Sequence, residues 1–320
     1  MNRKDKILVT GGSGFIGTNL MDFLLSQDYN VLNIDIYGPP KKEHEKYWRK
    51  LDICDFLLLE QFVLECSPDI VIHLAARTDL NGKSPEDYKA NTLGVENLLK
   101  VLDKITVKQA IFASSMYVCK PGYKPEKFDD YRPHTEYGIS KVETENLIKK
   151  HNPKYLWSIV RPTSIWGPYF GEPYNLFFKM VLSRKYFHMG KRACKKTYGY
   201  IGNVIYQIMS ILNADSEDVL GKVFYLGDYE PYDITEWADE IAEVAGFKIP
   251  NIPFFVFRIG GWFGDFLKIC GIKFPMTSFR LKNMTTDNIH DLSLIQQIAP
   301  DMPVNRITGV ERTVKWMKKT

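Results

Sequence analysis

The chain has 320 residues, of which 45% are hydrophobic, and this length suffices for one large domain or two of moderate size. Its net charge of +4 is small, and its basic residues lack the length and aromatic interleaving of a nucleic-acid groove, so no nucleic-acid partner is expected. The five cysteines form no CxxC pair, which indicates reduced thiols and a cytoplasmic location and argues against a disulfide framework or a metal site.

The first predicted elements are a strand over residues 6–10 and a helix over residues 15–25, joined by a glycine-rich turn. Gly11, Gly14 and Gly17 recur at every third position of this segment. The first glycine permits a tight turn, the second lets the backbone approach a pyrophosphate, and the third lets the helix pack close to the strand. Free N–H groups and the dipole at the helix N-terminus would hold the phosphates. The segment therefore predicts a dinucleotide-binding site.

The second predicted strand, residues 29–35, ends in Asp35. A carboxylate about 20 residues beyond such glycines accepts hydrogen bonds from the adenosine ribose hydroxyls and repels a 2′-phosphate. NAD is therefore favoured over NADP, although Lys41 and Lys42 keep NADP as an alternative. The other interpretation of Asp35 is an ordinary aspartate of a strand-end turn, because a Gly-Pro-Pro sequence follows.

Strand-like and helix-like runs alternate through the first half of the chain. Further strands are predicted at residues 47–51, 69–73, 108–114 and 155–160, and further helices at residues 55–66, 85–102 and 135–150. Such alternation predicts an α/β fold, a doubly wound parallel Rossmann-type sheet with helices on both faces. Ligands of these sheets bind beyond the carboxyl ends of the strands.

The alternating pattern loosens beyond about residue 166, where glycine, proline and aromatic residues crowd a predicted loop. We therefore expect an NAD-binding Rossmann domain over residues 1–166 and a smaller, mainly substrate-binding lobe over residues 167–320. Two segments of the second half are candidates to return to the first domain. One is residues 195–228, with a predicted strand at 222–226, and the other is a predicted helix at 235–245.

The most apolar part of the second half is residues 252–272. It contains Arg258, Asp265, Lys268 and several glycines, so it is not expected to span a membrane. Our prediction is a packed helix of the substrate lobe, and the alternative is an amphipathic helix that binds a surface. No apolar segment precedes the first strand of the chain, so a secretory signal is not expected either.

Polar residues that suit proton transfer follow the strand predicted at 108–114. Ser115 comes directly after it, and Tyr137 and Lys141 lie about one helical turn apart, so both share one helix face. A tyrosine ordinarily titrates near ~10, but a neighbouring ammonium and a positively charged nicotinamide would stabilise the phenolate. Ser115 would donate a hydrogen bond to the substrate oxygen. Together these side chains predict removal of a proton from a hydroxyl while a hydride leaves the same carbon.

These motifs together resemble the extended short-chain dehydrogenases/reductases of the NAD-dependent epimerase/dehydratase family. The resemblance covers roughly the first 170 residues and rests on Thr10-Gly-Gly-Ser-Gly-Phe-Ile-Gly17, Asp35, Asp52-Ile53, His73-Leu-Ala-Ala76, Asn91, Gly94, Asn97, Ser114-Ser115, Tyr137-Gly-x-Ser-Lys141, Arg161-Pro162 and Gly167-Pro168. It implies catalysis by Ser115, Tyr137 and Lys141. The residues that it implies as NAD contacts are Gly11, Gly14, Phe15, Ile16, Gly17, Asp35, Asp52, Ile53, Leu74, Ala75, Ala76, Asn91, Ser114, Tyr137, Lys141, Pro162 and Ser164.

Two departures from the family pattern narrow the reaction. Sugar 4,6-dehydratases carry an Asp-Glu pair directly after the serine or threonine, whereas Met116 and Tyr117 stand there in this chain, so dehydration is not expected. Cys119 replaces a tyrosine of the family and is expected to be a buried structural thiol. The basic stretch near Lys196 is either a contact for a nucleoside diphosphate or a solvated turn. The substrate contacts that the resemblance implies are Thr78, Ser115, Met116, Asn175, Lys196 and Tyr198.

The function predicted from this resemblance is that of an NAD-dependent nucleotide-sugar epimerase, acting at C4 through a transient 4-keto intermediate. The alternative is a net redox reaction, as in a 4-keto-sugar reductase or a 3β-hydroxysteroid-like alcohol dehydrogenase, because the C-terminal third looks closer to that branch. A third hypothesis is a non-catalytic dinucleotide sensor, against which the intact catalytic residues argue. The resemblance also implies a homodimer formed through the helices that hold residues 96–102 and 137–148.

Overall fold

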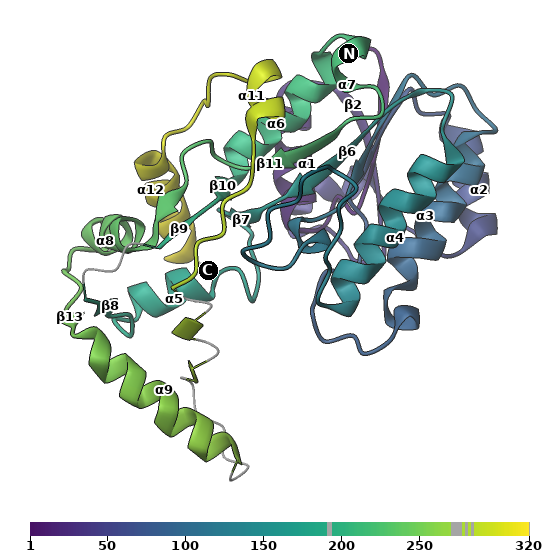
Figure 1. The fold of residues 1–320 in the computed structure, drawn as a ribbon. Helices are drawn as coiled ribbons and strands as arrows, with labels where there is room; N and C mark the ends of the chain where they lie inside the picture. Colours follow the sequence, from purple (N-terminus) through teal and green to yellow (C-terminus); the bar gives the residue numbers. More distant parts are fainter. Residues whose placement is uncertain (191–193, 270–276, 279–280, 283–284, 320) are drawn as a thin grey trace.

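A seven-stranded parallel sheet with the strand order β11-β6-β5-β4-β1-β2-β3 forms the centre of the molecule (Figure 1). The computed structural model describes residues 1–190, 194–269, 277–278, 281–282 and 285–319. The sheet strands are β1 (Lys6–Thr10), β2 (Asn30–Asp35), β3 (Trp48–Lys50), β4 (Ile70–His73), β5 (Gln109–Ala113), β6 (Leu156–Pro162) and β11 (Val223–Leu226). The predicted doubly wound Rossmann-type fold is therefore confirmed.

Helices cover both faces of this sheet, because successive residues of each strand point to opposite sides. On β1, Ile7 and Val9 belong to one hydrophobic core and Leu8 belongs to the other. The helices that accompany the sheet are α1 (Phe15–Ser26), α2 (Phe56–Cys66), α3 (Lys89–Leu102), α4 (Glu136–His151), α6 (Ile201–Asn213) and α7 (Ser216–Val219), with 3₁₀ turns η1 (Lys42–Tyr47), η2 (Pro85–Tyr88) and η3 (Met116–Val118).

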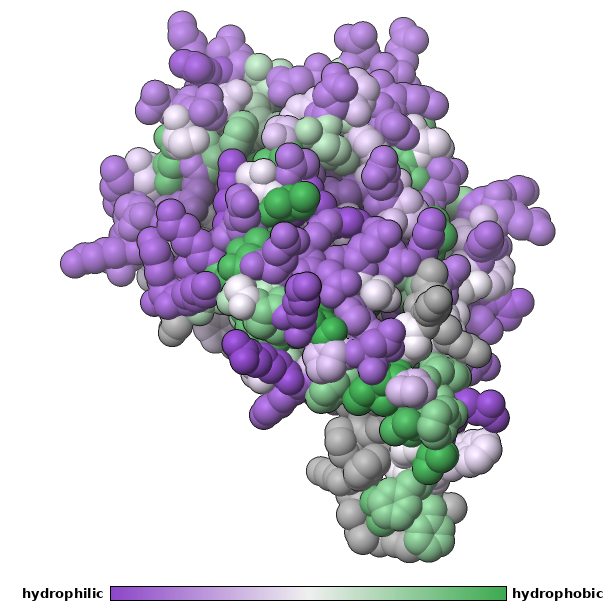
Figure 2. Space-filling view, turned by 90° about the vertical axis from the view of Figure 1, so that its left-hand side faces the viewer, coloured by the Kyte–Doolittle hydropathy of each residue, from purple (hydrophilic) through white to green (hydrophobic). Residues whose placement is uncertain are grey.

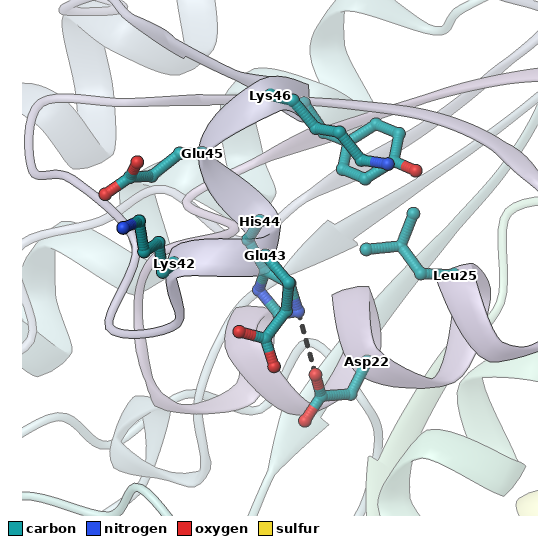
Figure 3. A pocket seen from close by; sticks show the side chains of 8 residues that line it. Asp22, Leu25, Lys42, Glu43, His44, Glu45 and Lys46 are labelled. Atoms are coloured by element: carbon teal, nitrogen blue, oxygen red, sulfur yellow. Dashed lines mark hydrogen bonds and ion pairs between the residues drawn. The ribbon is translucent and has the colours of Figure 1, made fainter.

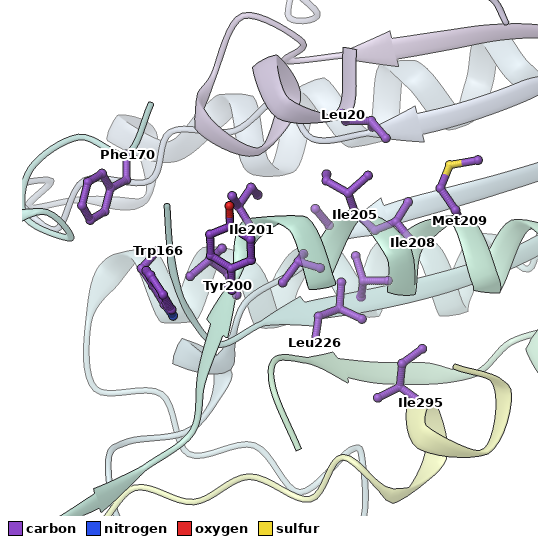
Figure 4. Packing of buried hydrophobic residues seen from close by; sticks show 14 of the residues in the cluster. Leu20, Trp166, Phe170, Tyr200, Ile201, Ile205, Ile208, Met209, Leu226 and Ile295 are labelled. Atoms are coloured by element: carbon purple, nitrogen blue, oxygen red, sulfur yellow. The ribbon is translucent and has the colours of Figure 1, made fainter. Parts of the chain in front are cut away.

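The larger core joins the sheet to the second lobe. Leu20 of α1 and Ile205 and Ile208 of α6 pack on one face of the sheet, and the same cluster continues to Trp166 and Phe170 beyond β6 (Figure 4). The second core holds side chains of α2, α3 and α4, including Val63 and Leu98. This shared packing fixes where the second lobe stands relative to the carboxyl ends of the strands.

The second lobe consists of short strand pairs and helices around an aromatic cluster that contains Trp166 and Trp237, whose ring centroids are 5.3 Å apart. Strand β10 pairs with β7, β12 with β9 and β13 with β8. The elements are β7 (Ser164–Trp166), α5 (Leu176–Leu182), β8 (His188–Met189), β9 (Lys195–Lys196), β10 (Tyr198–Tyr200), β12 (Tyr232–Asp233), α8 (Ile234–Ala245), β13 (Asn251–Ile252), α9 (Phe254–Ile269) and α12 (Arg306–Met317). Helix α11 (Ser293–Ile298) packs instead on β11 and α6, beside the central sheet.

Two segments of the second half were candidates to return to the first domain. The strand expected at 222–226 is β11, which pairs in parallel with β6 at the edge of the central sheet, and α6 packs on α1. The helix expected at 235–245 is α8, which packs instead against α5 and α12 of the second lobe. The chain therefore crosses from the second lobe to the sheet and back.

Helix α9 occupies most of the apolar stretch at 252–272, of which residues 270–272 lie outside the described part. The prediction of a packed helix is wrong for one of its faces, because Phe255, Trp262 and Phe266 are about 60% exposed (61%, 61% and 60%). The helix projects away from the body of the molecule beyond β8 and β13 (Figure 1). Among the helices that the structure describes, none is both long and apolar enough to cross a lipid bilayer.

Candidate functional site

The glycine-rich turn after β1 forms a cradle that only glycine permits. Gly11 has a φ of +76°, and a Cβ on it would lie 2.5 Å from the backbone nitrogen of Ala75. A Cβ on Gly17 would lie 2.2 Å from the carbonyl oxygen of Gly11, so the first turn of α1 can approach β1 closely. Gly14 precedes α1 without a side-chain cap, and the first turn carries no acidic residue. Phe15 and Ile16 thus start a helix whose N-terminus suits a pyrophosphate.

Asp35 at the end of β2 stands beside this cradle. Its carboxylate accepts hydrogen bonds from the backbone nitrogens of Ser13, at 3.1 Å, and of Tyr37, at 3.0 Å. Burial raises the pKa of Asp35, and these backbone hydrogen bonds oppose the rise. Lys41, which kept NADP as an alternative, is paired with Asp22 at 2.7 Å. The carboxylate is therefore fixed next to the glycine turn, where the ribose of a bound dinucleotide is expected.

Replacing Asp35 by alanine should weaken NAD binding by about 10–100-fold, because a hydrogen bond to a charged group is worth about 1.5–3 kcal/mol. The dissociation constants of NAD and NADP, measured by calorimetric titration, would show the change. Asp35→Asn is the matched control, since it keeps the shape and a hydrogen-bond acceptor but removes the repulsion of a 2′-phosphate. Both variants should lose discrimination against NADP, and an unchanged preference would remove Asp35 from the ribose contact.

The loops after β3 and β4 lie at the same carboxyl-end edge of the sheet as the glycine turn, where a dinucleotide would lie. Ile53 is buried against Gly94 of α3, where a Cβ would lie 2.5 Å from its side chain. Asp52 is exposed at the surface and accepts a hydrogen bond from the backbone nitrogen of Cys54 at 2.9 Å. After β4, the half-buried run at Leu74, Ala75 and Ala76 lies against Thr10 and Gly11, and the Ala75 nitrogen donates to the Thr10 hydroxyl at 3.2 Å.

Asn91 of α3 is fully buried and has both of its polar side-chain atoms engaged by the protein. Its Oδ1 accepts a hydrogen bond from the backbone nitrogen of Arg77 at 2.8 Å. Its Nδ2 donates to the Arg77 carbonyl at 3.0 Å and to the Ser140 hydroxyl at 2.9 Å. Asn91 thus ties the loop after β4 to α4, which makes it a positioning residue for the groups that α4 carries.

Ser115 and Tyr137 meet at the carboxyl end of β5. Tyr137 lies in the first turn of α4, whose start Thr135 caps by accepting a hydrogen bond from the Gly138 nitrogen at 3.0 Å. Both side chains are almost fully buried, with exposed fractions of 7% for Ser115 and 4% for Tyr137. Burial raises the pKa of Tyr137, and a hydrogen bond with Ser115 opposes that rise. The pair therefore joins a hydroxyl to a phenol in a place from which water is largely excluded.

Lys141 follows one turn later on α4 and is also buried. Its Nζ donates a hydrogen bond to the carbonyl oxygen of Ala113, the last residue of β5, at 2.8 Å. Burial lowers the pKa of Lys141 to about 8, and the negative charge of Glu145 opposes this shift. The ammonium is thus held between the end of β5 and the next acid along the same helix face.

Glu145 and Arg161 form a fully buried ion pair that the sequence analysis did not assign to the site. Two hydrogen bonds join them, from Arg161 Nε at 2.7 Å and from Arg161 Nη2 at 2.8 Å. The hydroxyl of Tyr131 donates to the same carboxylate at 2.8 Å, and Arg161 Nη1 donates to the hydroxyl of Tyr225 at 3.1 Å. The positions of Lys141 and Glu145, four residues apart on one helix, were a readable signal for this network.

Aromatic rings surround the Tyr137 phenol. The ring centroid of Tyr117 is 5.8 Å from that of Tyr137, and that of Tyr88 is 6.0 Å from it. Tyr117 also stacks on His134 at 5.8 Å. Tyr174 lies near enough to Tyr137 for its charge to affect the pKa of the phenol. Tyr88 and Tyr174 have no periodic spacing in the sequence, because each lies in a loop or short turn that only the folded chain brings to the site.

The remaining residues expected at the site differ in how far they are buried. Thr78 is exposed, whereas Met116, Pro162 and Ser164 are half-buried at strand ends, and Ser114 is buried. Tyr198 packs within the aromatic cluster, 4.6 Å from the ring of Trp237.

Asn175 and Lys196 both lie in the second lobe. Asn175 is buried before α5, and its Oδ1 has no hydrogen-bond partner among the residues described, which leaves an acceptor for a ligand. Lys196 is on β9, opposite Tyr232 of β12.

Two other buried groups have structural roles. His73 at the end of β4 shares a hydrogen bond with the Thr10 hydroxyl at 2.7 Å, and burial lowers its pKa to about 3, so it remains neutral. Cys119 is buried, as expected for a structural thiol, and its thiol donates to the Asp130 carbonyl at 3.5 Å.

A cavity of about 520 Å³ opens between α1 and η1 (Figure 3). His44 and Asp22 lie in its wall, with a hydrogen bond of 2.8 Å between His44 Nε2 and the carboxylate. Its lining comes from Asp22, Leu25 and residues 42–47 and does not include the glycine turn or Tyr137. The cavity is therefore separate from the site built on the strand ends.

The glycine cradle, the acid at the end of β2 and the buried serine, tyrosine and lysine define an extended short-chain dehydrogenase/reductase. Residues 7–227 match the model of the NAD dependent epimerase/dehydratase family, and the chain belongs to that family. It is accordingly an enzyme with NAD as its cofactor. The residues of the glycine turn fit this cofactor, because a Cβ would fill the space that Gly11 and Gly17 leave between loop and helix.

Relatives of this chain match most of its length. The N-acetyl-alpha-D-glucosaminyl-diphospho-ditrans,octacis-undecaprenol 4-epimerase of Escherichia coli O157:H7 is 27% identical, over 98% of this chain and 95% of its own length. The 3-beta-hydroxysteroid dehydrogenase of Mycolicibacterium neoaurum is 28% identical, over 77% of this chain and 72% of its own length. The family thus contains both epimerases and dehydrogenases of comparable similarity to this chain.

Solved structures share the fold along the whole chain. The UDP-glucose 4-epimerase of Thermotoga maritima, crystallised with UDP-glucose, is 22% identical and superposes with a TM-score of 0.74 over 98% of this chain and 99% of its own. The UDP-glucuronic acid 4-epimerase of Bacillus cereus, in complex with NAD, is 21% identical with a TM-score of 0.74 over 98% and 96% of the two chains. These likenesses show a shared fold.

Proposed function

We propose that the protein is an NAD-dependent 4-epimerase of a hexose carried on a diphosphate, with a nucleotide sugar as its expected substrate. The observation that carries this proposal is the buried contact of Ser115 with Tyr137 at the end of β5, in a chain that aligns from end to end with a 4-epimerase. A further relative, 27% identical over 76% of this chain, is a putative UDP-glucose 4-epimerase of Methanocaldococcus jannaschii. Both relatives act at C4 by name.

The chain supplies the proton chemistry of this reaction. Tyr137 removes the proton of the C4 hydroxyl. Ser115 donates a hydrogen bond to the substrate oxygen, whose charge changes as that proton leaves. Lys141 holds a positive charge one turn along the helix, which favours the phenolate form of Tyr137. NAD, when bound, would supply a reversible hydride acceptor next to these side chains. The burial of all three side chains strengthens these electrostatic effects.

The second lobe supplies the contacts that would hold the sugar diphosphate. We propose Asn175 as a hydrogen-bond acceptor for the sugar, because its buried Oδ1 has no partner among the residues described. Lys196 and Thr78 are proposed contacts for polar groups of the sugar diphosphate. Met116 is proposed to pack against the sugar next to Ser115, where a dehydratase would carry an acid.

Two further features belong to this proposal. We propose a homodimer through α3 and α4, which pack on each other and expose Leu93 and Ile139, at 42% and 45%. A cytoplasmic location agrees with the cysteines that the structure describes, which are Cys54, Cys66, Cys119 and Cys194 and are all unpaired.

A net dehydrogenase reaction is the second candidate, and the similarity to the hydroxysteroid dehydrogenase favours it. The same three side chains serve both reactions, because each begins with removal of a proton from a hydroxyl. The difference lies in the fate of the hydride. An epimerase returns it to the substrate, whereas a dehydrogenase releases it as free NADH.

Epimerisation should therefore give an isomer without net reduction of NAD. We would offer UDP-, GDP-, CDP- and dTDP-sugars that carry deuterium at C4 to the purified enzyme, with and without added NAD. The expected result is a C4 isomer that retains the deuterium, with no change in nicotinamide absorbance. Stoichiometric formation of labelled NADH would contradict the proposal and support the dehydrogenase.

A further inference from the structure

Helix α9 exposes a large apolar face. A helix on a protein surface normally turns its apolar face inward. In α9, the side chains of Phe255, Ile259, Trp262 and Phe266 recur at the spacing of one helix face, and their exposed fractions are 61%, 56%, 61% and 60%. Figure 2 shows these apolar groups gathered on the part that projects from an otherwise mostly hydrophilic body.

The side of α9 that is turned toward the protein carries two glycines beside the partly buried ring of Phe257. Gly261 and Gly264 are buried, and a Cβ on Gly261 would lie 3.3 Å from the backbone nitrogen of Ser278. That nitrogen donates a hydrogen bond to the carboxylate of Asp265 at 3.1 Å. The described polar and close backbone contacts of α9 are thus made at its glycine side, and the four large apolar side chains of the other face are directed outward.

The segment around α9 also carries the excess positive charge of the chain. Residues 248–282 contain six basic residues and one acidic residue, whereas the net charge of the whole chain is +4. Arg258 lies over the ring of Trp262, with 5.4 Å from its guanidinium carbon to the ring centroid. Aromatic and basic side chains on one exposed helix favour the interface of an anionic bilayer, where rings lie at headgroup depth.

Helix α9 extends from the lobe that would bind the substrate. Tyr174, which directly precedes Asn175 and α5, lies near Tyr137 of the site, and β8 follows α5 directly and pairs with β13, the strand that leads into α9. Figure 1 shows α9 beyond this strand pair, away from the central sheet. A surface that α9 touched would thus lie next to the substrate-binding side of the molecule.

We propose that α9 docks the protein on the surface of an anionic phospholipid bilayer, and that the diphosphate of its substrate is carried by an isoprenoid lipid in that bilayer. With 16 residues, α9 is too short to span the hydrocarbon core and suits the interface plane. The second part rests on the proposed function and draws on the relative that acts on an undecaprenol diphosphate sugar. The docking itself stands on the helix alone.

The docking is tested by co-sedimentation with vesicles of phosphatidylcholine and phosphatidylglycerol. The full chain should bind them, and should bind vesicles of phosphatidylcholine alone at least several-fold more weakly. A variant with Phe255→Gln, Ile259→Gln, Trp262→Gln and Phe266→Gln should lose at least about 100-fold in binding, because these side chains supply the buried apolar area. The control replaces Leu57, Leu58 and Leu64 of α2 by glutamine, since they are also exposed, and should bind as the parent does.

Other occupants of this face give different results. If the full chain fails to bind anionic vesicles, the docking is wrong. A second copy of the chain covers the face if the parent is a dimer that does not bind vesicles and the α9 variant is a monomer by analytical ultracentrifugation. That result would overturn the proposal. Equal loss of binding in the α2 control would also overturn it, because the effect would not belong to α9.

The lipid substrate is tested with an isoprenoid diphosphate N-acetylhexosamine embedded in the same vesicles. The parent should epimerise it, and the α9 variant should lose most of that turnover while it keeps its turnover of a water-soluble sugar diphosphate. Vesicle binding without turnover of any sugar diphosphate would reject the proposed function and leave the docking intact. Turnover of soluble substrates without vesicle binding would reject the docking and leave the proposed function intact.

Discussion

Replacement of Tyr137 by phenylalanine should lower kcat by about 10²–10⁴-fold, the usual contribution of a positioned acid–base group. The ring would keep its packing against Tyr117 and Tyr88, so the fold and the cofactor site should be little affected. Only the hydroxyl that accepts the substrate proton is removed. Steady-state kinetics on the substrate found by the sugar panel would measure the loss, and the dissociation constant of NAD should stay within a few-fold.

Tyr155→Phe is the matched control for Tyr137→Phe. It removes the same hydroxyl from a half-buried tyrosine, whose buried oxygen has no hydrogen-bond partner among the described residues. Its kcat should equal that of the parent. If Tyr137→Phe retained full turnover, Tyr137 would not be the base, and the proton would have to leave through Ser115 or a neighbouring ring.

The fold was predictable because buried parallel strands appear as short apolar runs between helical ones. The predicted strand at 69–73 is Ile70–His73, and the predicted helix at 135–150 is Glu136–His151, so the bounds differ by one residue at most. The second lobe was less readable, since its strands are two or three residues long and their pairing depends on contacts between distant segments. The sequence also could not predict that the apolar face of α9 points outward. Hydrophobic periodicity shows that a helix has an apolar face, but not whether that face is turned to the protein or to solvent.

Within the site, the residues found from the sequence are those with local spacing. The glycines, Tyr137 and Lys141 follow one another at fixed intervals along a turn or a helix, and the chemistry needs those intervals. Arg161 and Tyr174 carry no such interval, because β6 and the loop before α5 bring them to the site only in the folded chain. The role of Asn91 as a clamp also appears only when Arg77 and Ser140 are seen to occupy its amide.

The protonation state of Lys141 links the buried ion pair to activity. Burial lowers the pKa of Lys141 to about 8, so the ammonium is present below that pH and is lost above it. Because the charged form favours the Tyr137 phenolate, the rate should fall on the alkaline side with an apparent pKa near 8. Between this value and the ordinary lysine pKa, the unfolded chain binds more protons than the folded one, so the contribution of Lys141 to stability increases with pH.

Glu145→Gln should move this alkaline limb to lower pH by about one unit, because it removes the negative charge that raises the pKa of Lys141. It should also lower the free energy of unfolding by about 3–5 kcal/mol, since Arg161 is left charged and buried without its partner. Glu143→Gln, on the exposed side of the same helix, makes the same charge change away from the network and should alter neither quantity.

The two readouts of Glu145→Gln separate a positioning role from a structural one. Denaturant unfolding gives the loss of stability, and the pH dependence of kcat, measured below the unfolding transition, gives the shift of the limb. A less stable enzyme with an unchanged pH profile would show that Glu145 supports the fold without setting the charge of Lys141. A shift of the alkaline limb of the pH profile would show that the Arg161–Glu145 pair affects proton transfer at Tyr137. Lys141 would carry this effect, because it lies between Tyr137 and Glu145 on α4.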